Sequence, residues 1–178
     1  MTIQFIDALK FASEKHVYQR KKGFDRLPYI NHPIYVAHLL LHAGETDDEL
    51  LTAALLHDIL EDTDVTEQEL KSLFGGRVSN IVIELTDDTS ISYDDRKRAQ
   101  IHKAPILTVD AKKIKIADKI ANISDLLRYD FNWSTRRKTQ YLEWSKKVIE
   151  ACRGINTQLD HQFDEILMKA YLETDPGL

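Results

Sequence analysis

The chain has 178 residues, with 24 Lys and Arg against 29 Asp and Glu, and a formal net charge of −5. This length suits one domain with a hydrophobic core large enough to need no covalent staples. The single cysteine, Cys152, excludes a disulfide framework and a zinc module built from several cysteines. A hydrophobic content of 43% excludes a disordered chain. The mild acidity offers no general attraction to nucleic acid or to a membrane surface.

Membrane association and export are not expected. The longest apolar runs, such as residues 50–56, are much shorter than the ~18–20 residues that span a bilayer. The first residues include Asp7 and lack a basic leader followed by an apolar run, so they do not resemble a signal peptide. We therefore expect a cytoplasmic protein with neither nucleic acid nor membrane as a partner.

Hydrophobic residues recur with the helical period along almost the whole chain, and no window alternates as a strand would. Capping-box patterns at Thr46–Glu49 and Thr66–Glu69 predict helix starts, and Gly44 predicts a helix end. The expected helices span residues 2–19, 31–43, 47–61, 67–74, 77–86, 93–104, 109–128, 134–153 and 156–173. Residues 1–178 are thus predicted to form a single all-α domain of about eight or nine helices.

Polar groups interrupt three of these apolar stretches, first in LLTAALLHDILEDTD at residues 50–64. Seven mostly apolar residues are followed directly by His57 and Asp58, and then by Glu61 and Asp62. On one continuous helix, His57 and Glu61 would share a face, and the two aspartates would share the neighbouring face. Ionisable groups are costly to bury unpaired, so we expect them to be paired or to bind a metal. The alternative is that this edge of the helix only faces water.

The other two interruptions supply further candidate ligands. Asp118 lies in the middle of KKIKIADKIANISDLL, a helix that is apolar around most of its circumference, with Asn122 and Asp125 on the same face. His32 lies in PYINHP, between a turn and a helix that Pro33 begins.

Two imidazoles and two carboxylates together suit a divalent ion such as Mn²⁺, Fe²⁺ or Zn²⁺. The candidate metal ligands are His32, His57, Asp58 and Asp118. Water bound to such an ion becomes a nucleophile near neutral pH, as hydrolysis of a phosphoester requires. Glu61 and Asp62 follow one turn later, where they are placed to orient that water or to carry protons. A second histidine pair, His38 and His42, is surrounded by leucines with no carboxylate nearby.

These residues resemble the HD-domain hydrolases, which are named for the adjacent His-Asp pair. More narrowly, the chain is similar to the hydrolase domain of RelA/SpoT-type alarmone enzymes in its small, stand-alone form. The matching stretches are RKKG…LPYINHPIYVA (20–37), AALLHDILEDTDVT (53–66), FGGRVSNIVIELTDD (74–88), KIKIADKIANISDL (113–126) and WSTRRKTQYLEW (133–144). They follow the family order and cover most of the chain from residue 8 to about 153.

The resemblance implies an all-α fold that binds one Mn²⁺. It also implies removal of the 3′-pyrophosphate from ppGpp or pppGpp, giving GDP or GTP and pyrophosphate. Position by position, it implies that His32, His57, Asp58 and Asp118 bind the metal and that Glu61 and Asp62 form the catalytic acidic pair. Residues 155–178 lie largely outside the match, and we expect a packing helix at about residues 156–173. Its apolar face (Phe163, Ile166, Leu167 and Tyr171) would also suit a homodimer contact.

The same resemblance implies substrate-binding positions. Asn122 would lie near the ribose, and Arg137 and Tyr141 would contact phosphates and sugar. For the family's basic pair, counting back from Pro28 selects Lys21 and Lys22, whereas aligning the pair itself selects Arg20 and Lys21. Ser124 stands where the family often has Arg. A predicted phosphate funnel collects the basic residues near these positions: Arg20, Lys21, Lys22, Arg26, Lys112, Lys113, Lys115, Lys119, Arg136, Arg137 and Lys138.

Two alternatives remain at this stage. One is an HD phosphohydrolase for another nucleotide, such as an adenine alarmone or a 3′-phosphorylated cofactor. The other is a catalytically silent alarmone-binding regulator, although a pure binder would not need Glu61 and Asp62. A synthetase activity is not expected, because the matched hydrolase segments leave no room for a nucleotide-transferring domain.

Overall fold

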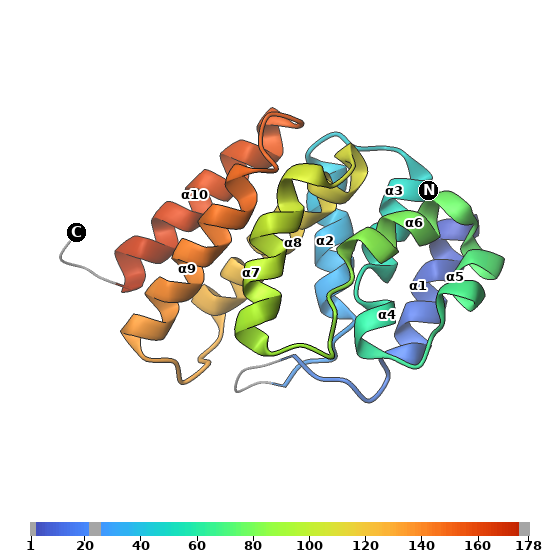
Figure 1. Cartoon of the computed structure of the whole chain (residues 1–178), viewed down its shortest axis with the longest axis horizontal. Helices are drawn as coiled ribbons and strands as arrows, with labels where there is room; N and C mark the ends of the chain where they lie inside the picture. The colour runs from blue at the N-terminus through green and yellow to red at the C-terminus, as the bar shows by residue number, and fades with distance from the viewer. Residues whose placement is uncertain (1–2, 22–25, 175–178) are drawn as a thin grey trace.

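The computed structural model describes residues 3–21 and 26–174, and within these ranges the regular secondary structure is helical (Figure 1). This confirms the predicted all-α class. The α-helices are α1 (Ile3–Lys15), α2 (Asn31–His42), α3 (Asp48–Leu56), α4 (Ile59–Asp62), α5 (Glu67–Phe74), α6 (Gly76–Leu85), α7 (Tyr93–Lys103), α8 (Val109–Arg128), α9 (Thr135–Glu150) and α10 (Thr157–Thr174). A short 3₁₀ helix, η1 (Ala104–Ile106), joins α7 to α8. No helix in the described ranges is long and apolar enough to cross a membrane.

Helix ends follow the capping signals, with one shift. Thr66 accepts a hydrogen bond from the backbone N–H of Glu69 at 3.2 Å, as its capping-box pattern predicts. Gly44 has a φ of +84°, a left-handed conformation that favours glycine and ends α2. The cap of α3 is Asp47 and not Thr46, because the Asp47 carboxylate accepts from the N–H of Leu50 at 3.0 Å. The helix therefore begins one residue later than the pattern implied.

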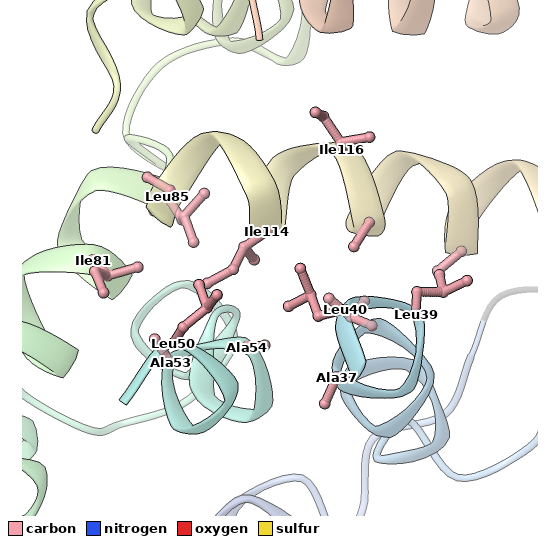
Figure 2. Close-up of a cluster of buried hydrophobic side chains, with 14 of the residues drawn as sticks. Ala37, Leu39, Leu40, Leu50, Ala53, Ala54, Ile81, Leu85, Ile114 and Ile116 are labelled. Atoms are coloured by element: carbon pink, nitrogen blue, oxygen red, sulfur yellow. The ribbon is translucent and has the colours of Figure 1, made fainter. Parts of the chain in front are cut away.

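Helix α8 is the centre of the core. It packs against α2 and α3 on one side and against α9 and α10 on the other (Figure 1). Figure 2 shows Ile114 beside Leu50 and Leu85, whereas Ile116 points to the opposite side of α8. Both isoleucines are fully buried, and each contributes about 1.5–3 kcal/mol to folding by leaving water. A polar residue in the middle of α8, such as Asp118, is therefore held in the interior of the protein.

The predicted helix over residues 47–61 is wrong in one respect, because it is broken. Helix α3 ends at Leu56, a turn contains His57 and Asp58, and the short helix α4 begins at Ile59. Asp58 has φ −100° and ψ 0°, in the sparsely populated region between helix and strand. On a continuous helix His57 and Asp58 would point in directions about 100° apart. The turn instead brings both side chains to the same interior point.

Helix α10 packs on α8 and α9 at the end of the chain. Phe163 and Leu167 are buried there, and Ile166 and Tyr171 pack against the core while partly exposed. Much of the apolar face that the sequence offered for either packing or a dimer contact is thus covered within the chain itself.

Candidate metal centre and catalytic cleft

The four candidate ligands come from three separate elements and meet inside the protein. His32 lies near the start of α2, His57 and Asp58 lie in the turn after α3, and Asp118 lies on α8. Nε2 of His32 is 3.2 Å from Oδ1 of Asp118, and Nε2 of His57 is 3.0 Å from Oδ2 of Asp58. One donor atom from each of His32, His57 and Asp118 lies within 4.8 Å of the other two. Oδ2 of Asp58 is 3.7 Å from Nε2 of His32, so Asp58 borders the same point.

The two ring nitrogens of His57 have the surroundings that are typical of a metal-binding histidine. Its Nδ1 lies 2.8 Å from the carbonyl oxygen of Ala54, which fixes the ring. Its Nε2 is buried and lies 3.0 Å from Oδ2 of Asp58, but it makes no hydrogen bond of good geometry in the described part of the chain. A metal-binding histidine characteristically uses one ring nitrogen for the ion and the other for a carbonyl or carboxylate. The donor set of imidazoles and carboxylates also fits a divalent transition ion.

The electrostatics of the cluster keep both of its carboxylates ionised. Burial opposes ionisation of Asp58 and Asp118, but His57 and His32 beside Asp58, and Lys119 beside Asp118, hold both pKa values below the usual range. Burial lowers the pKa of His57, but the carboxylates of Asp58 and Asp118 outweigh it and raise that pKa to about 9. Two buried carboxylates therefore remain ionised, and the positive charges of His57 and Lys119 lie beside them.

Neighbouring side chains fix the two carboxylates. The Asn122 amide donates to Oδ1 of Asp118 at 2.6 Å, and Nζ of Lys119 donates to Oδ2 of the same residue at 2.8 Å. The hydroxyl of Tyr29 donates to Asp58. Burial raises the pKa of Tyr29 well above 10, so the hydroxyl keeps its proton and remains a donor. Tyr29 was not among the residues predicted from the sequence, where its only signal is its position in PYINHP, close to His32.

The predicted acidic pair separates into two environments. Glu61 lines the deep pocket of about 160 Å³ that contains the candidate ligands, and it accepts a hydrogen bond from the N–H of Asp87 at 3.3 Å. Burial and the nearby Asp87 carboxylate raise the pKa of Glu61 to about 7. Asp62 lies nearer the surface and accepts from the Gln19 amide at 2.8 Å. Glu61 thus has a pKa suited to proton transfer near neutral pH.

The pocket that contains the four candidate metal ligands opens into a wider cleft of about 660 Å³ between the α1–α2 connection, α7, α8 and α9. Such a volume accommodates a small-molecule ligand of nucleotide size. Aromatic rings form a row along one wall: Phe131, Trp133, Tyr141 and Trp144, with successive ring centroids 5.5, 5.6 and 5.5 Å apart. The predicted substrate-binding residues Arg20, Lys21, Asn122, Arg137 and Tyr141 all line this cleft. Lys22 lies outside the described residues.

The predicted phosphate funnel is only partly assembled. Lys113 pairs with Glu45 at 2.8 Å, Lys112 donates to the carbonyl of Pro105 at 3.0 Å, and Arg136 lines a separate groove. Two cations that the sequence analysis missed, Arg96 and Lys97, do line the cleft. Both lie on α7, in which no residue is buried, so no hydrophobic period marked its inner face. His38 and His42 lie in a different groove, outside the cleft.

Comparisons with known proteins identify the family to which the chain belongs. Residues 8–142 match the HD domain. A zebrafish protein named guanosine-3′,5′-bis(diphosphate) 3′-pyrophosphohydrolase MESH1 is 43% identical over 170 residues, which cover 94% of each chain. The human protein of the same name is 45% identical over 159 residues, covering 88% of this chain and 89% of its own.

Solved structures extend the likeness to three dimensions. A structure described as a metazoan ortholog of SpoT that hydrolyzes ppGpp matches with a TM-score of 0.91 and 41% identity, covering 95% of this chain and 96% of that one. A Listeria monocytogenes structure matches with a TM-score of 0.67 and 26% identity over 81% of this chain. In both sequence and fold, therefore, the chain belongs to the HD-domain family, in the group of the metazoan SpoT homologs.

Proposed function

We propose that this protein is a divalent-metal-dependent guanosine-3′,5′-bis(diphosphate) 3′-pyrophosphohydrolase. It would remove the 3′-pyrophosphate from ppGpp or pppGpp and leave GDP or GTP. The observation that carries the proposal is the buried cluster of two imidazoles and two carboxylates at the base of a cationic and aromatic cleft. The names of the similar proteins from zebrafish and human supply the substrate.

His32, His57, Asp58 and Asp118 would hold the ion, and we propose Mn²⁺. Fe²⁺ and Zn²⁺ bind similar mixtures of imidazole and carboxylate and remain the alternatives. When bound, the ion would supply Lewis acidity toward the phosphoryl group and lower the pKa of water.

The protein's own side chains would orient the carboxylate ligands and transfer protons. Tyr29 and Asn122 hold the carboxylates of Asp58 and Asp118 in fixed orientations, which avoids reorganisation during the reaction. Glu61, with a pKa near 7, would accept a proton from the attacking water or return one to the leaving group. Asp62, held by Gln19 at the edge of the cleft, would support this transfer.

The wider cleft would bind the nucleotide. The aromatic row offers ring faces for the base, and Arg137, stacked 4.3 Å over Trp133, adds a cation at the same wall. Arg20 and Lys21, in the connection between α1 and α2, would bind phosphate groups. Ser124 bonds to the carbonyl of Ile120 at 2.8 Å and lines another groove, so it is not part of this cleft.

Stacking alone does not distinguish guanine from adenine, because every base has an aromatic face. An HD phosphohydrolase for an adenine nucleotide or a 3′-phosphorylated cofactor is therefore the second candidate. The presence of Glu61 beside the metal cluster argues against a silent binding protein.

The direct test measures pyrophosphate release from guanosine tetraphosphate by protein loaded with Mn²⁺ and by chelator-treated protein. Adenosine tetraphosphate with the same 3′,5′ pattern serves as the parallel substrate. We expect metal-dependent release that favours the guanine nucleotide. Equal or faster release from the adenine nucleotide would support the second candidate, and binding without any release would support the silent regulator.

A further inference from the structure

Arg96, on α7, faces Glu61 at the boundary between the deep pocket and the wider cleft. Its Nη1 is 3.6 Å from Oε1 of Glu61, which is longer than a hydrogen bond. Its Nε is buried and has no hydrogen-bond partner within residues 3–21 and 26–174. The guanidinium of Arg96 thus has one buried N–H without a hydrogen-bond partner among the described residues, and its Nη1 meets Glu61 only loosely.

Within the described residues, the other cations that line the cleft already have partners. Lys119 pairs with Asp118 at 2.8 Å, and Lys21 pairs with Asp125 at 2.5 Å. Arg20 donates hydrogen bonds to the carbonyls of Val17 and Gln19 at 2.8 and 2.9 Å. Arg137 lies 4.3 Å from the ring centre of Trp133, and Lys97 lies 4.7 Å from that of Trp144. Of the three ion pairs that described cleft cations make, the Arg96–Glu61 pair is the longest, and a loose, partly exposed pair of this kind contributes little to stability.

The position of Arg96 indicates which part of a nucleotide it would meet. Its partner Glu61 lines the pocket that holds the candidate metal ligands, where the reacting phosphoryl group must lie. The planar guanidinium can donate two parallel hydrogen bonds to two oxygens of a phosphate. The Glu61 carboxylate, 3.6 Å away, does not accept such a pair. The backbone of α7 is fixed beside it, because the Trp144 indole N–H donates to the carbonyl of Lys97 at 3.0 Å.

We propose that Arg96 binds the departing 3′-pyrophosphate, and that this contact replaces its ion pair with Glu61. The arriving phosphate would satisfy the guanidinium and leave the Glu61 carboxylate unpaired and able to transfer a proton. This inference deepens the proposed function and rests on it for the identity of the leaving group. Arg96 lies on α7, from which the sequence predicted no site residue.

The test uses the variants Arg96→Ala and Arg96→Lys, with Arg98→Ala as the matched control. Arg98 lies on the same helix, is 65% exposed and pairs with Asp95, away from the cleft. The probe is inorganic pyrophosphate, whose binding to the metal-loaded protein is measured by calorimetry. Its inhibition of guanosine tetraphosphate hydrolysis is measured in parallel.

We expect Arg96→Ala to weaken pyrophosphate binding at least about tenfold, the effect of losing one charge-assisted contact. Arg96→Lys should recover only part of it, and Arg98→Ala should change it by less than about twofold. Pyrophosphate binding by Arg96→Ala that equals binding by the Arg98→Ala control would overturn the inference. A wild-type protein that hydrolyses no guanosine tetraphosphate would overturn the proposed function instead, and the calorimetry would still decide the role of Arg96.

Discussion

The hydroxyl of Tyr29 donates a hydrogen bond to Oδ2 of Asp58 at 2.5 Å, and the same oxygen lies 3.0 Å from Nε2 of His57. A residue in the α1–α2 connection thereby fixes a carboxylate in the turn between α3 and α4. Because the phenol keeps its proton, it holds the Asp58 oxygen toward the interior point where His32 and Asp118 also meet.

Replacing Tyr29 with Phe should therefore weaken metal binding while leaving every proposed ligand in place. Loss of such a supporting hydrogen bond typically costs about 10–100-fold in metal affinity or activity. The measurement is a Mn²⁺ titration of the metal-free protein. Tyr18→Phe is the control, since Tyr18 is 91% exposed. Equal affinities for the two variants would show that Tyr29 does not support the site.

Glu61→Gln should separate chemistry from metal binding. Glu61 borders the metal cluster but is not among the proposed ligands, so we expect the metal content to stay unchanged. Turnover should fall by about 10²–10⁴, the usual contribution of a positioned acid or base. Elemental analysis of the purified variant beside its kcat tests both statements. A variant that loses the metal would show that Glu61 is a ligand and not a proton carrier.

The pH profile gives an independent check on Glu61. Burial and Asp87 raise its pKa to about 7, so below that pH the group is protonated and cannot accept a proton. The rate should rise as pH increases toward 7, and a bound cation would move this ascending limb to lower pH. The limb should be missing from the profile of Glu61→Gln. An identical limb in both proteins would assign it to another group.

The C-terminal helix should be essential to the stability of the fold. Phe163 of α10 is fully buried, and Phe163→Ala should lower the free energy of unfolding by about 3–5 kcal/mol. Met168 on the same helix is 67% exposed, so Met168→Ala should change it by no more than about 0.5 kcal/mol. Chemical denaturation of both variants measures the difference. A small loss for Phe163→Ala would mean that α10 adds little to the core.

Sequence alone was sufficient for the helical architecture, because amphipathic periods and capping residues such as Thr66 are local signals. It was insufficient at the His57-Asp58 turn, because apolar residues on both sides continue the helical period through the break. His32, His57, Asp58 and Asp118 were predicted as a ligand set from polar residues in apolar stretches and from a family resemblance. The structure brings these side chains together through tertiary packing around α8.

The cleft was harder to predict than the metal cluster. Arg96 and Lys97 lie on a helix with no buried residue, so composition marks them only as surface charges. Lys112 and Lys113 lie near the site in sequence, but helical geometry turns them toward Pro105 and Glu45. The packing of whole helices decides which basic residues face a cleft. Local sequence patterns do not predict this packing.

The most direct test of the account compares His57→Ala with His38→Ala, an exposed histidine outside the cleft. Bound metal and pyrophosphate release from guanosine tetraphosphate are measured on the same preparations. We expect His57→Ala to lose its metal and at least about 100-fold in turnover, since even supporting residues cost roughly 10–100-fold, while His38→Ala matches the wild type. A His57→Ala protein that releases pyrophosphate at the wild-type rate would contradict the claim that this cluster holds the catalytic metal.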